Sequence, residues 1–147
     1  VPPTLSTITA IPVSSSANTR RFDIAALIGG MNGGMGRHSI NGKTFDMERI
    51  DETVQAGTTE IWEFDNMMGD EIHPMHIHGV QFQVLERTGG RNKLIATEKG
   101  WKDTVLVMPG EKVRLIMTFP DYTGTFVLHC HNLEHEDDGM MLNYEIV

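Results

Sequence analysis

The chain has 147 residues, 39% of them hydrophobic and 22% charged, which suits one globular domain with its own core rather than two or three. Its net charge of −8 argues against a nucleic-acid-binding protein, because phosphate backbones select basic surfaces. No apolar run approaches the ~20 residues that a membrane-spanning helix requires.

The first segment of the chain has the composition of an interdomain linker. Residues 1–19 are rich in proline, serine and threonine, which favours an extended connector, and residues 20–147 are expected to form the domain. The N-terminus lacks both the basic region and the apolar region of a secretory signal peptide.

Most of the remaining chain alternates short hydrophobic runs with turn signals. The predicted strands are residues 20–28, 58–66, 80–87, 93–97, 103–108, 112–119, 125–131 and 141–147, with a Gly/Met-rich loop at 29–36. Pro109-Gly110 predicts a hairpin-like turn between two of these strands. The only helix candidate, residues 132–138, is too short to be stable by itself. The spacing predicts an all-β sandwich or barrel.

The strand predicted at residues 125–131 carries metal ligands on both of its faces. Consecutive side chains of a strand point to opposite faces, so His129 and His131 face one way and Cys130 the other. His135 and Met140 follow Cys130 by five and ten residues. With one further histidine these residues supply a thiolate, two imidazoles and a thioether, the donors of a blue-copper electron-transfer site. Zinc also binds cysteine and histidine but gains nothing from a thioether.

A second segment holds three histidines within six residues. His76 and His78 share a face at strand period, whereas His73 is expected just before the strand, where Pro74 fixes the backbone. The simplest assignment makes His73 the remaining ligand of the Cys130 site. A second, all-nitrogen site would then be formed by His76, His78, His129 and His131. Surface histidines without a ligand role are the alternative, but their concentration in two short windows favours metal.

Both windows match long motifs of one family. HPMHIHG (residues 73–79) and HCHNLEHEDDGM (129–140) resemble the HPxHxHG and HCHxxxHxxxxM motifs of multicopper oxidases. INGKTFDMERID (40–51) and GWKDTVLV (100–107) resemble bacterial members of the laccase, cuprous oxidase and bilirubin oxidase group. The resemblance runs from about Ile40 to the C-terminus and is to the C-terminal domain. It implies a Greek-key β-barrel or sandwich of the cupredoxin type.

The resemblance also implies which copper each residue binds. The type 1 copper, which takes electrons from the substrate, would be held by His73, Cys130, His135 and the axial ligand Met140. His76 would bind the type 2 copper, and His78, His129 and His131 the type 3 pair. In the family these centres oxidise substrate one electron at a time and reduce dioxygen to water.

The chain supplies only part of the family's histidines. Half of the trinuclear cluster's histidines come from an N-terminal domain in the family, whereas this chain has seven histidines in all, and His38 stands alone. The expected partners are therefore N-terminal cupredoxin domains, of the same precursor or a separate chain. O2 and a small phenolic or Cu(I) reductant are the expected substrates, and the family resemblance implies a periplasmic or extracellular location.

Two acidic residues are expected to support the copper sites. A ligating histidine usually donates its other N–H to a carboxylate or carbonyl, and Asp103 resembles the family acid beside the type 1 copper, with His73 as the expected partner. Glu136 matches the proton-relaying acid of the cuprous oxidase branch, since oxygen reduction consumes protons. Ordinary surface carboxylates are the alternative for both. The methionines near residues 29–36 are either soft Cu(I) donors or loop residues without a ligand.

Two other functions compete with an oxidase. An electron-transfer cupredoxin with only a type 1 copper would explain Cys130 and its co-ligands but would leave four histidines without a role. A structural module that has lost copper would be expected to have lost ligands, and every position that the resemblance assigns to a ligand is filled.

Overall fold

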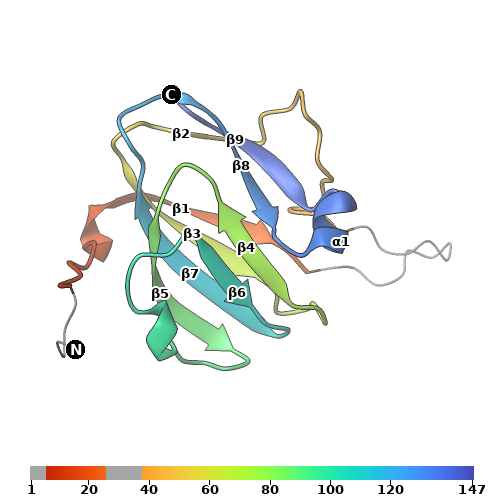
Figure 1. The fold of residues 1–147 in the computed structure, drawn as a ribbon, viewed down its shortest axis with the longest axis horizontal. Coiled ribbons are helices and arrows are strands. Elements are labelled where there is room, and N and C mark those ends of the chain that lie inside the picture. The colour runs from red at the N-terminus through yellow and green to blue at the C-terminus, as the bar shows by residue number, and fades with distance from the viewer. Residues whose placement is uncertain (1–5, 26–37) are drawn as a thin grey trace, which may run out of the picture.

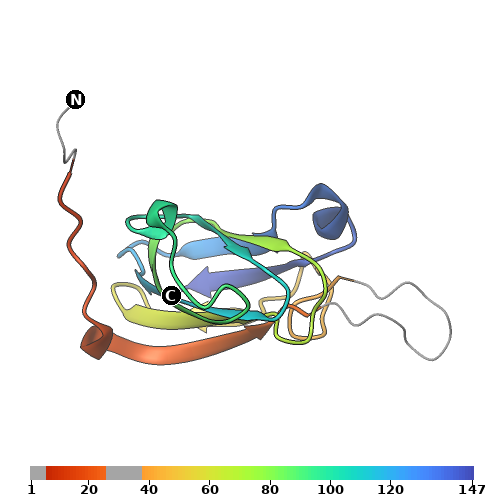
Figure 2. The same cartoon turned by 90° about the horizontal axis from the view of Figure 1, so that it is seen from below.

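The computed structural model describes residues 6–25 and 38–147, in which β-strands form two sheets and one short helix lies at the far end from the N-terminal segment (Figures 1 and 2). The predicted loop at residues 29–36 lies outside the described residues. The elements are η1 Val13–Ser15, β1 Ser16–Asp23, β2 Glu52–Val54, β3 Thr59–Asp65, β4 His73–Ile77, β5 Phe82–Gly89, η2 Ala96–Glu98, β6 Thr104–Val107, β7 Glu111–Thr118, β8 Gly124–Cys130, α1 Leu133–Asp137 and β9 Met141–Ile146. Among these elements no helix has the length and apolar character needed to cross a membrane.

The strands form a four-stranded sheet in the order β1-β3-β7-β5 and a five-stranded sheet in the order β2-β9-β8-β4-β6. The β1–β3 and β2–β9 pairs are parallel, and the remaining pairs are antiparallel. The all-β prediction is therefore confirmed, with both sheets mixed in direction.

The core between the sheets is aromatic. Trp62 of β3 and Tyr144 of β9 are fully buried, and their ring centroids lie 5.5 Å apart in an edge-on arrangement. Phe22 of β1 lies 4.9 Å from Trp62, measured between ring centroids. Trp62 and Phe64 lie two residues apart along β3, so both rings point into the core.

Several predicted boundaries are wrong. β1 begins at Ser16 and ends at Asp23, so the strand starts four residues earlier than predicted. Ser16, Asn18 and Thr19 of the predicted linker-like segment pair with β3. The three-residue strand β2 was not predicted. Residues 93–97 were predicted as a strand, but residues 93–95 have no regular structure and residues 96–97 belong to η2. Glu98 accepts hydrogen bonds from the Ile95 amide and from Arg87, which hold this segment in place.

The predicted hairpin at Pro109-Gly110 is also wrong. β6 pairs with β4 in the five-stranded sheet, whereas β7 pairs with β3 and β5 in the four-stranded sheet. The turn at Pro109-Gly110 therefore carries the chain from one sheet to the other. This crossing leaves β4 between β6 and β8, which brings the two histidine-rich windows together.

We expect Arg87→Met to lower the free energy of unfolding of the metal-free chain by about 3–5 kcal/mol, the usual cost of removing one partner of a buried ion pair. The Arg87 side chain is fully buried, pairs with Glu98, and its Nη1 lies 2.8 Å from Oε2 of the equally buried Glu111. Burial raises the pKa of Glu111, but hydrogen bonds from Arg91 and from the backbone outweigh burial and lower the pKa to about 2. The carboxylate therefore stays charged. Urea denaturation measures the loss.

The matched control is Arg114→Met, which removes an arginine from a surface pair. Arg114 Nη1 lies 2.6 Å from Glu86 Oε1, but both side chains are partly exposed. Exposed pairs contribute at most about 1 kcal/mol. Equal losses in the two variants would show that burial does not decide the contribution of Arg87.

Candidate metal centre

The two histidine-rich windows are neighbouring antiparallel strands. β4 pairs with β8 so that Met75 lies opposite Cys130 and His76 lies opposite His129. Because side chains alternate along both strands, Cys130 points to the same side as Met75, and His76 shares the other side with His129. His73 is the first residue of β4 and pairs with Val107, so the expectation that it precedes the strand is wrong.

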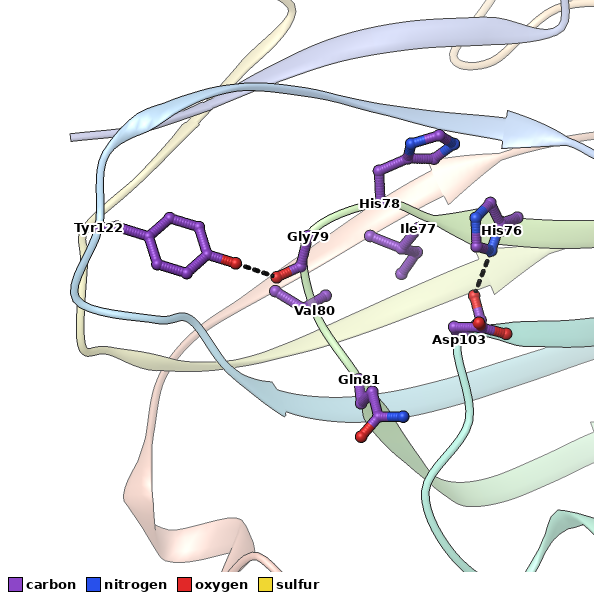
Figure 3. A pocket seen from close by; sticks show the side chains of 8 residues that line it. All are labelled: His76, Ile77, His78, Gly79, Val80, Gln81, Asp103 and Tyr122. Atoms are coloured by element: carbon purple, nitrogen blue, oxygen red, sulfur yellow. Dashed lines mark hydrogen bonds between the residues drawn. The ribbon is translucent and has the colours of Figure 1, made fainter.

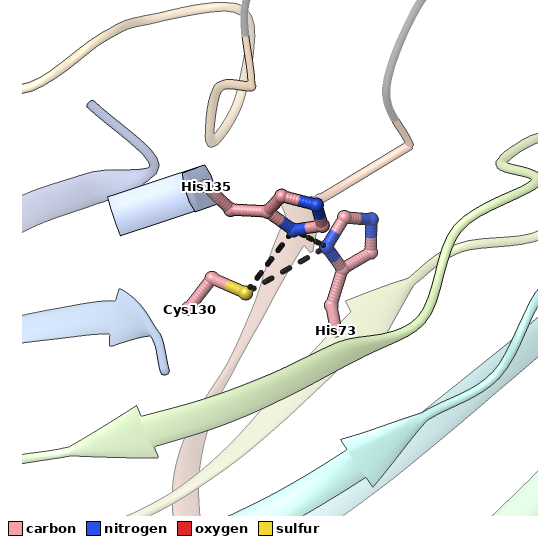
Figure 4. Close-up of side chains that lie close together, drawn as sticks. All are labelled: His73, Cys130 and His135. Carbon is pink, nitrogen blue, oxygen red and sulfur yellow. Dashed lines mark hydrogen bonds between the residues drawn. The ribbon is translucent and has the colours of Figure 1, made fainter. Parts of the chain in front are cut away.

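The first donor set lies on the inner side of this strand pair. Cys130 Sγ lies 3.8 Å from His73 Nδ1 and 3.5 Å from His135 Nδ1, and the two nitrogens are 3.1 Å apart (Figure 4). All three residues are buried. Donor atoms bound about 2.0–2.3 Å from one ion are separated by roughly 3.3–3.7 Å, so the set fits a single metal ion. A thiolate with two imidazoles suits copper.

The segment after β8 carries His135 and Met140 into position. Asn132 caps α1 by accepting a hydrogen bond from the Glu134 amide at 3.2 Å, which starts the helix predicted for this segment. The Met140 amide donates to the His135 carbonyl at 2.9 Å, and the Cys130 amide donates to the Met140 carbonyl at 3.0 Å. Met140 and Cys130 are both fully buried and belong to the same cluster of buried side chains.

Burial tunes the protonation of the first donor set. It lowers the pKa of His73 from its usual 6.5 to about 4, so the imidazole is neutral at pH 7 and keeps a free lone pair. Burial likewise raises the pKa of the Cys130 thiol to about 11, so the metal-free thiol is protonated. A metal ion that binds here must displace that proton, and its affinity therefore rises with pH.

The second donor set lies on the opposite side of the same strands. His78 Nε2 and His129 Nε2 face each other at 3.1 Å, and His76 completes a group whose nitrogens lie within 4.8 Å of one another. The His131 ring centroid lies 5.3 Å from that of His129 and 5.7 Å from that of His76. Four imidazoles gathered in this way fit a nitrogen-coordinated metal site.

Two histidines of this set place their Nδ1 atom next to a backbone carbonyl. His76 Nδ1 lies 2.9 Å from the Asp103 carbonyl oxygen (Figure 3), and His129 Nδ1 lies 3.1 Å from the Cys130 carbonyl oxygen. An N–H at Nδ1 that donates to a carbonyl leaves Nε2 as the lone-pair donor, the pattern typical of metal-ligating histidines. The expected pairing of Asp103 with His73 is therefore wrong: Asp103 supports His76, and it does so through its main chain.

A turn fixes His78 at the end of this donor set. Gly79 follows with a φ of +78°, a conformation that favours glycine, and a Cβ there would lie 2.7 Å from the Phe126 ring. The Tyr144 hydroxyl donates a hydrogen bond to the His78 carbonyl. His76, His78 and Asp103 line an open pocket beside this turn (Figure 3).

Three further side chains lie at the two donor sets. Glu136 Oε2 lies 3.4 Å from His129 Nδ1, so the acid singled out from the motif is next to the second donor set. His38, expected to stand alone, stacks on His135 with ring centroids 3.8 Å apart. Glu71 Oε2 lies 2.6 Å from His38 Nε2 and 3.2 Å from His135 Nε2. Neither His38 nor Glu71 was predicted, and the only available signal was the position of Glu71 two residues before His73.

Comparison with known proteins gives one consistent family. The model of the multicopper oxidase family matches residues 3–147. A laccase of Haloferax volcanii is 46% identical over 114 residues, which is 77% of this chain and 20% of the relative. The multicopper oxidase mco of Staphylococcus haemolyticus is 41% identical over 131 residues, 87% of this chain and 28% of the relative.

Solved structures agree with these relatives. A laccase from Pediococcus acidilactici matches with a TM-score of 0.83 and 40% identity over 100% of this chain and 30% of that one. The McoA multicopper oxidase from Aquifex aeolicus matches with a TM-score of 0.81 and 35% identity over 97% of this chain and 32% of that one. This chain thus spans a fifth to a third of the length of these proteins. The likeness confirms the predicted cupredoxin-type fold.

Proposed function

Because the chain belongs to the multicopper oxidase family, whose cofactor is copper, we propose that it is the C-terminal cupredoxin domain of such an oxidase. In this proposal residues 20–147 are the domain and residues 1–19 are the linker-like segment, whose last four residues begin β1. The domain accepts single electrons from a substrate at a type 1 copper and passes them to a trinuclear copper cluster that reduces O2 to water. His73, Cys130, His135 and Met140 hold the type 1 copper. His76 binds the type 2 copper, and His78, His129 and His131 bind the type 3 pair.

One observation carries the proposal. The two donor sets lie on opposite sides of the β4–β8 strand pair, with Cys130 in the first set and its direct neighbours His129 and His131 in the second. Two sets joined through a few covalent bonds give electrons a short route from one side of the sheet to the other. A protein that only shuttles electrons needs the first set alone.

Two residues assist the second donor set in this proposal. Glu136 lies within 3.4 Å of His129 and its side chain is 31% exposed, so it can take protons from solvent and deliver them toward the site where O2 is reduced. Asp103 fixes the tautomer of His76 through its carbonyl, and its carboxylate accepts a hydrogen bond from the Thr104 hydroxyl at 3.0 Å.

The second donor set also indicates what must join this chain. N-terminal cupredoxin domains, in the same precursor or a separate polypeptide, supply the remaining cluster histidines in this proposal. The half-buried His76 and the exposed His78 line the open pocket beside Gly79, where such a partner can approach. The reducing substrate is a small phenol or Cu(I), and the location is periplasmic or extracellular, as in the family's secreted members.

The proposal is tested by counting copper in two samples. The first is this chain alone, and the second is this chain assembled with the polypeptide that carries the missing histidines. We expect the chain alone to bind a single copper with intense blue absorption and to consume no oxygen. Additional copper and oxygen consumption should appear only in the assembled protein, because the second donor set is incomplete without its partner.

An assembled protein that binds one copper per chain and consumes no oxygen would contradict the oxidase and support an electron-transfer cupredoxin. Failure of the assembled protein to develop blue absorption after copper loading would contradict both functions. Metal analysis, absorption spectroscopy and an oxygen electrode provide the three readouts.

A further inference from the structure

We propose that Glu71, held in place by His38, is a positioning residue for His135: it accepts the Nε2–H of that imidazole and so keeps Nδ1 free to bind copper. The inference rests on the proposed function in that His135 is taken as a type 1 copper ligand. Neither Glu71 nor His38 belongs to a motif that carried the family resemblance. Both lie against the outer edge of the first donor set.

One carboxylate oxygen of Glu71 lies between two imidazoles. Glu71 Oε2 is 2.6 Å from His38 Nε2 and 3.2 Å from His135 Nε2. The two rings are stacked, with centroids 3.8 Å apart and planes 15° from parallel. His38 is anchored in turn at the end of α1, because its backbone N–H donates to Asp138 Oδ2 at 2.8 Å and its Nδ1 lies 3.1 Å from the same oxygen.

This arrangement decides between the two tautomers of a neutral His135. Nδ1 lies 3.5 Å from Cys130 Sγ and 3.1 Å from His73 Nδ1, so a proton on Nδ1 would occupy the position where the metal must bind. A proton on Nε2 instead points to the Glu71 carboxylate. Glu71 therefore stabilises the tautomer whose Nδ1 carries the lone pair.

A competing neighbour favours the opposite tautomer. The Asn132 side-chain nitrogen lies 3.3 Å from His135 Nε2 and can donate to it only when Nε2 carries no proton. A hydrogen bond from N–H to a carboxylate is roughly twice as strong as one between neutral groups, so Glu71 outweighs Asn132. Without Glu71, the hydrogen bond from Asn132 to Nε2 would stabilise the tautomer that carries its proton on Nδ1.

His73 lacks such a partner. Its Nε2 is buried and has no hydrogen-bond partner in the described part of the chain, so the pairing is particular to His135. The Glu71 side chain is 44% exposed, whereas that of His135 is 8% exposed. Glu71 can therefore be replaced without opening the core, which makes its effect on His135 measurable.

The experiment uses the full-length oxidase carrying Glu71→Leu, with Glu71→Gln as the conservative variant. In the metal-free protein labelled with 15N-histidine, we expect Glu71→Leu to move His135 from the Nε2–H toward the Nδ1–H tautomer. Its affinity for type 1 copper should fall about 10–100-fold, the usual effect of losing a ligand's hydrogen-bond partner. Glu71→Gln keeps a carbonyl oxygen as acceptor and should restore the Nε2–H tautomer and most of the affinity.

Glu134→Leu is the matched control, because it removes an exposed carboxylate of α1 that acts on His135 through its charge but has no hydrogen bond to the ring among the described contacts. We expect it to leave the tautomer and the affinity unchanged. An unchanged His135 tautomer in Glu71→Leu, or an equal change in Glu134→Leu, overturns the proposal. Loss of a bound copper ion without any change at the type 1 site would also overturn it, since Glu71 would then be a ligand itself.

The tautomer measurement separates this proposal from the proposed function. It needs no copper, so the Nε2–H tautomer in the unmodified protein and its loss in Glu71→Leu support the pairing even if blue absorption never develops. Absence of blue absorption would contradict only the type 1 site.

Discussion

Replacing Cys130 with serine is expected to abolish the intense blue absorption and substrate oxidation together. Cys130 is the only cysteine of the chain, and its Sγ lies within 3.8 Å of both imidazole nitrogens of the first donor set. A serine hydroxyl is a hard, weakly acidic donor that does not replace a thiolate for copper. We expect steady-state oxidation to fall at least about 100-fold, because loss of even an indirect partner of a metal ligand costs about 10–100-fold.

The fold should survive this substitution. Serine is nearly the same size as cysteine, and the hydrogen bond from the residue 130 amide to the Met140 carbonyl at 3.0 Å involves only backbone atoms. In the assembled oxidase the variant should therefore keep the copper bound by the histidines of the second donor set, which metal analysis checks. Persistence of the blue absorption in Cys130→Ser would remove Cys130 from the type 1 site and contradict the assignment.

The separation of the histidines and Cys130 into two donor sets could be predicted because it depends on local geometry. Alternation along a strand places His129 and Cys130 on opposite sides whatever the rest of the fold does, and the register of β4 against β8 preserves this separation. The short helix after β8 was predictable for the same reason, since Asn132 caps it from within the same segment.

The features that were missed depend on contacts between distant segments. Pro109-Gly110 has the residues of a hairpin turn, but the same turn also serves a chain that passes from one sheet to the other. The choice is made by the pairing of β6 with β4, which no local pattern encodes. Residues 93–97 contain a short apolar run that favours a strand, but the hydrogen bonds that Glu98 accepts from Arg87 and from the Ile95 amide override that preference.

The residues around the two donor sets were also missed because they depend on contacts between distant segments. His38 is 100 residues away from Asp138, to which its backbone and ring both bond, and no spacing rule connects the two. Asp103 was paired with the wrong histidine because the motif indicates that Asp103 lies near the metal ligands but not which histidine it contacts. β6 begins at Thr104 and pairs with β4, which turns the Asp103 carbonyl toward His76.

Replacing His129 with alanine is expected to impair the other half of the reaction from the half that Cys130→Ser impairs. Substrate oxidation at the type 1 site should persist for one turnover, whereas oxygen reduction should fail. His129 Nε2 lies 3.1 Å from His78 Nε2, so the substitution removes one donor from the centre of the second set. It leaves the side chains of the first set untouched, because they lie on the other side of β8. We expect steady-state oxygen consumption to fall at least about 100-fold, more than the loss of an indirect partner would cost.

A single-turnover experiment separates the two halves of the reaction. Substrate added to His129→Ala under argon should bleach the blue absorption as it does in the unmodified protein, and admitting air should fail to restore the colour. In the unmodified protein the colour should return, because the proposed function gives its electrons a route from the type 1 site through Cys130 to the second donor set. Cys130→Ser serves as the reciprocal control, since it has no colour to bleach but keeps the histidine-bound copper. Rapid recovery of the colour in His129→Ala would mean that oxygen is reduced without His129, and the cluster assignment of this strand would be wrong.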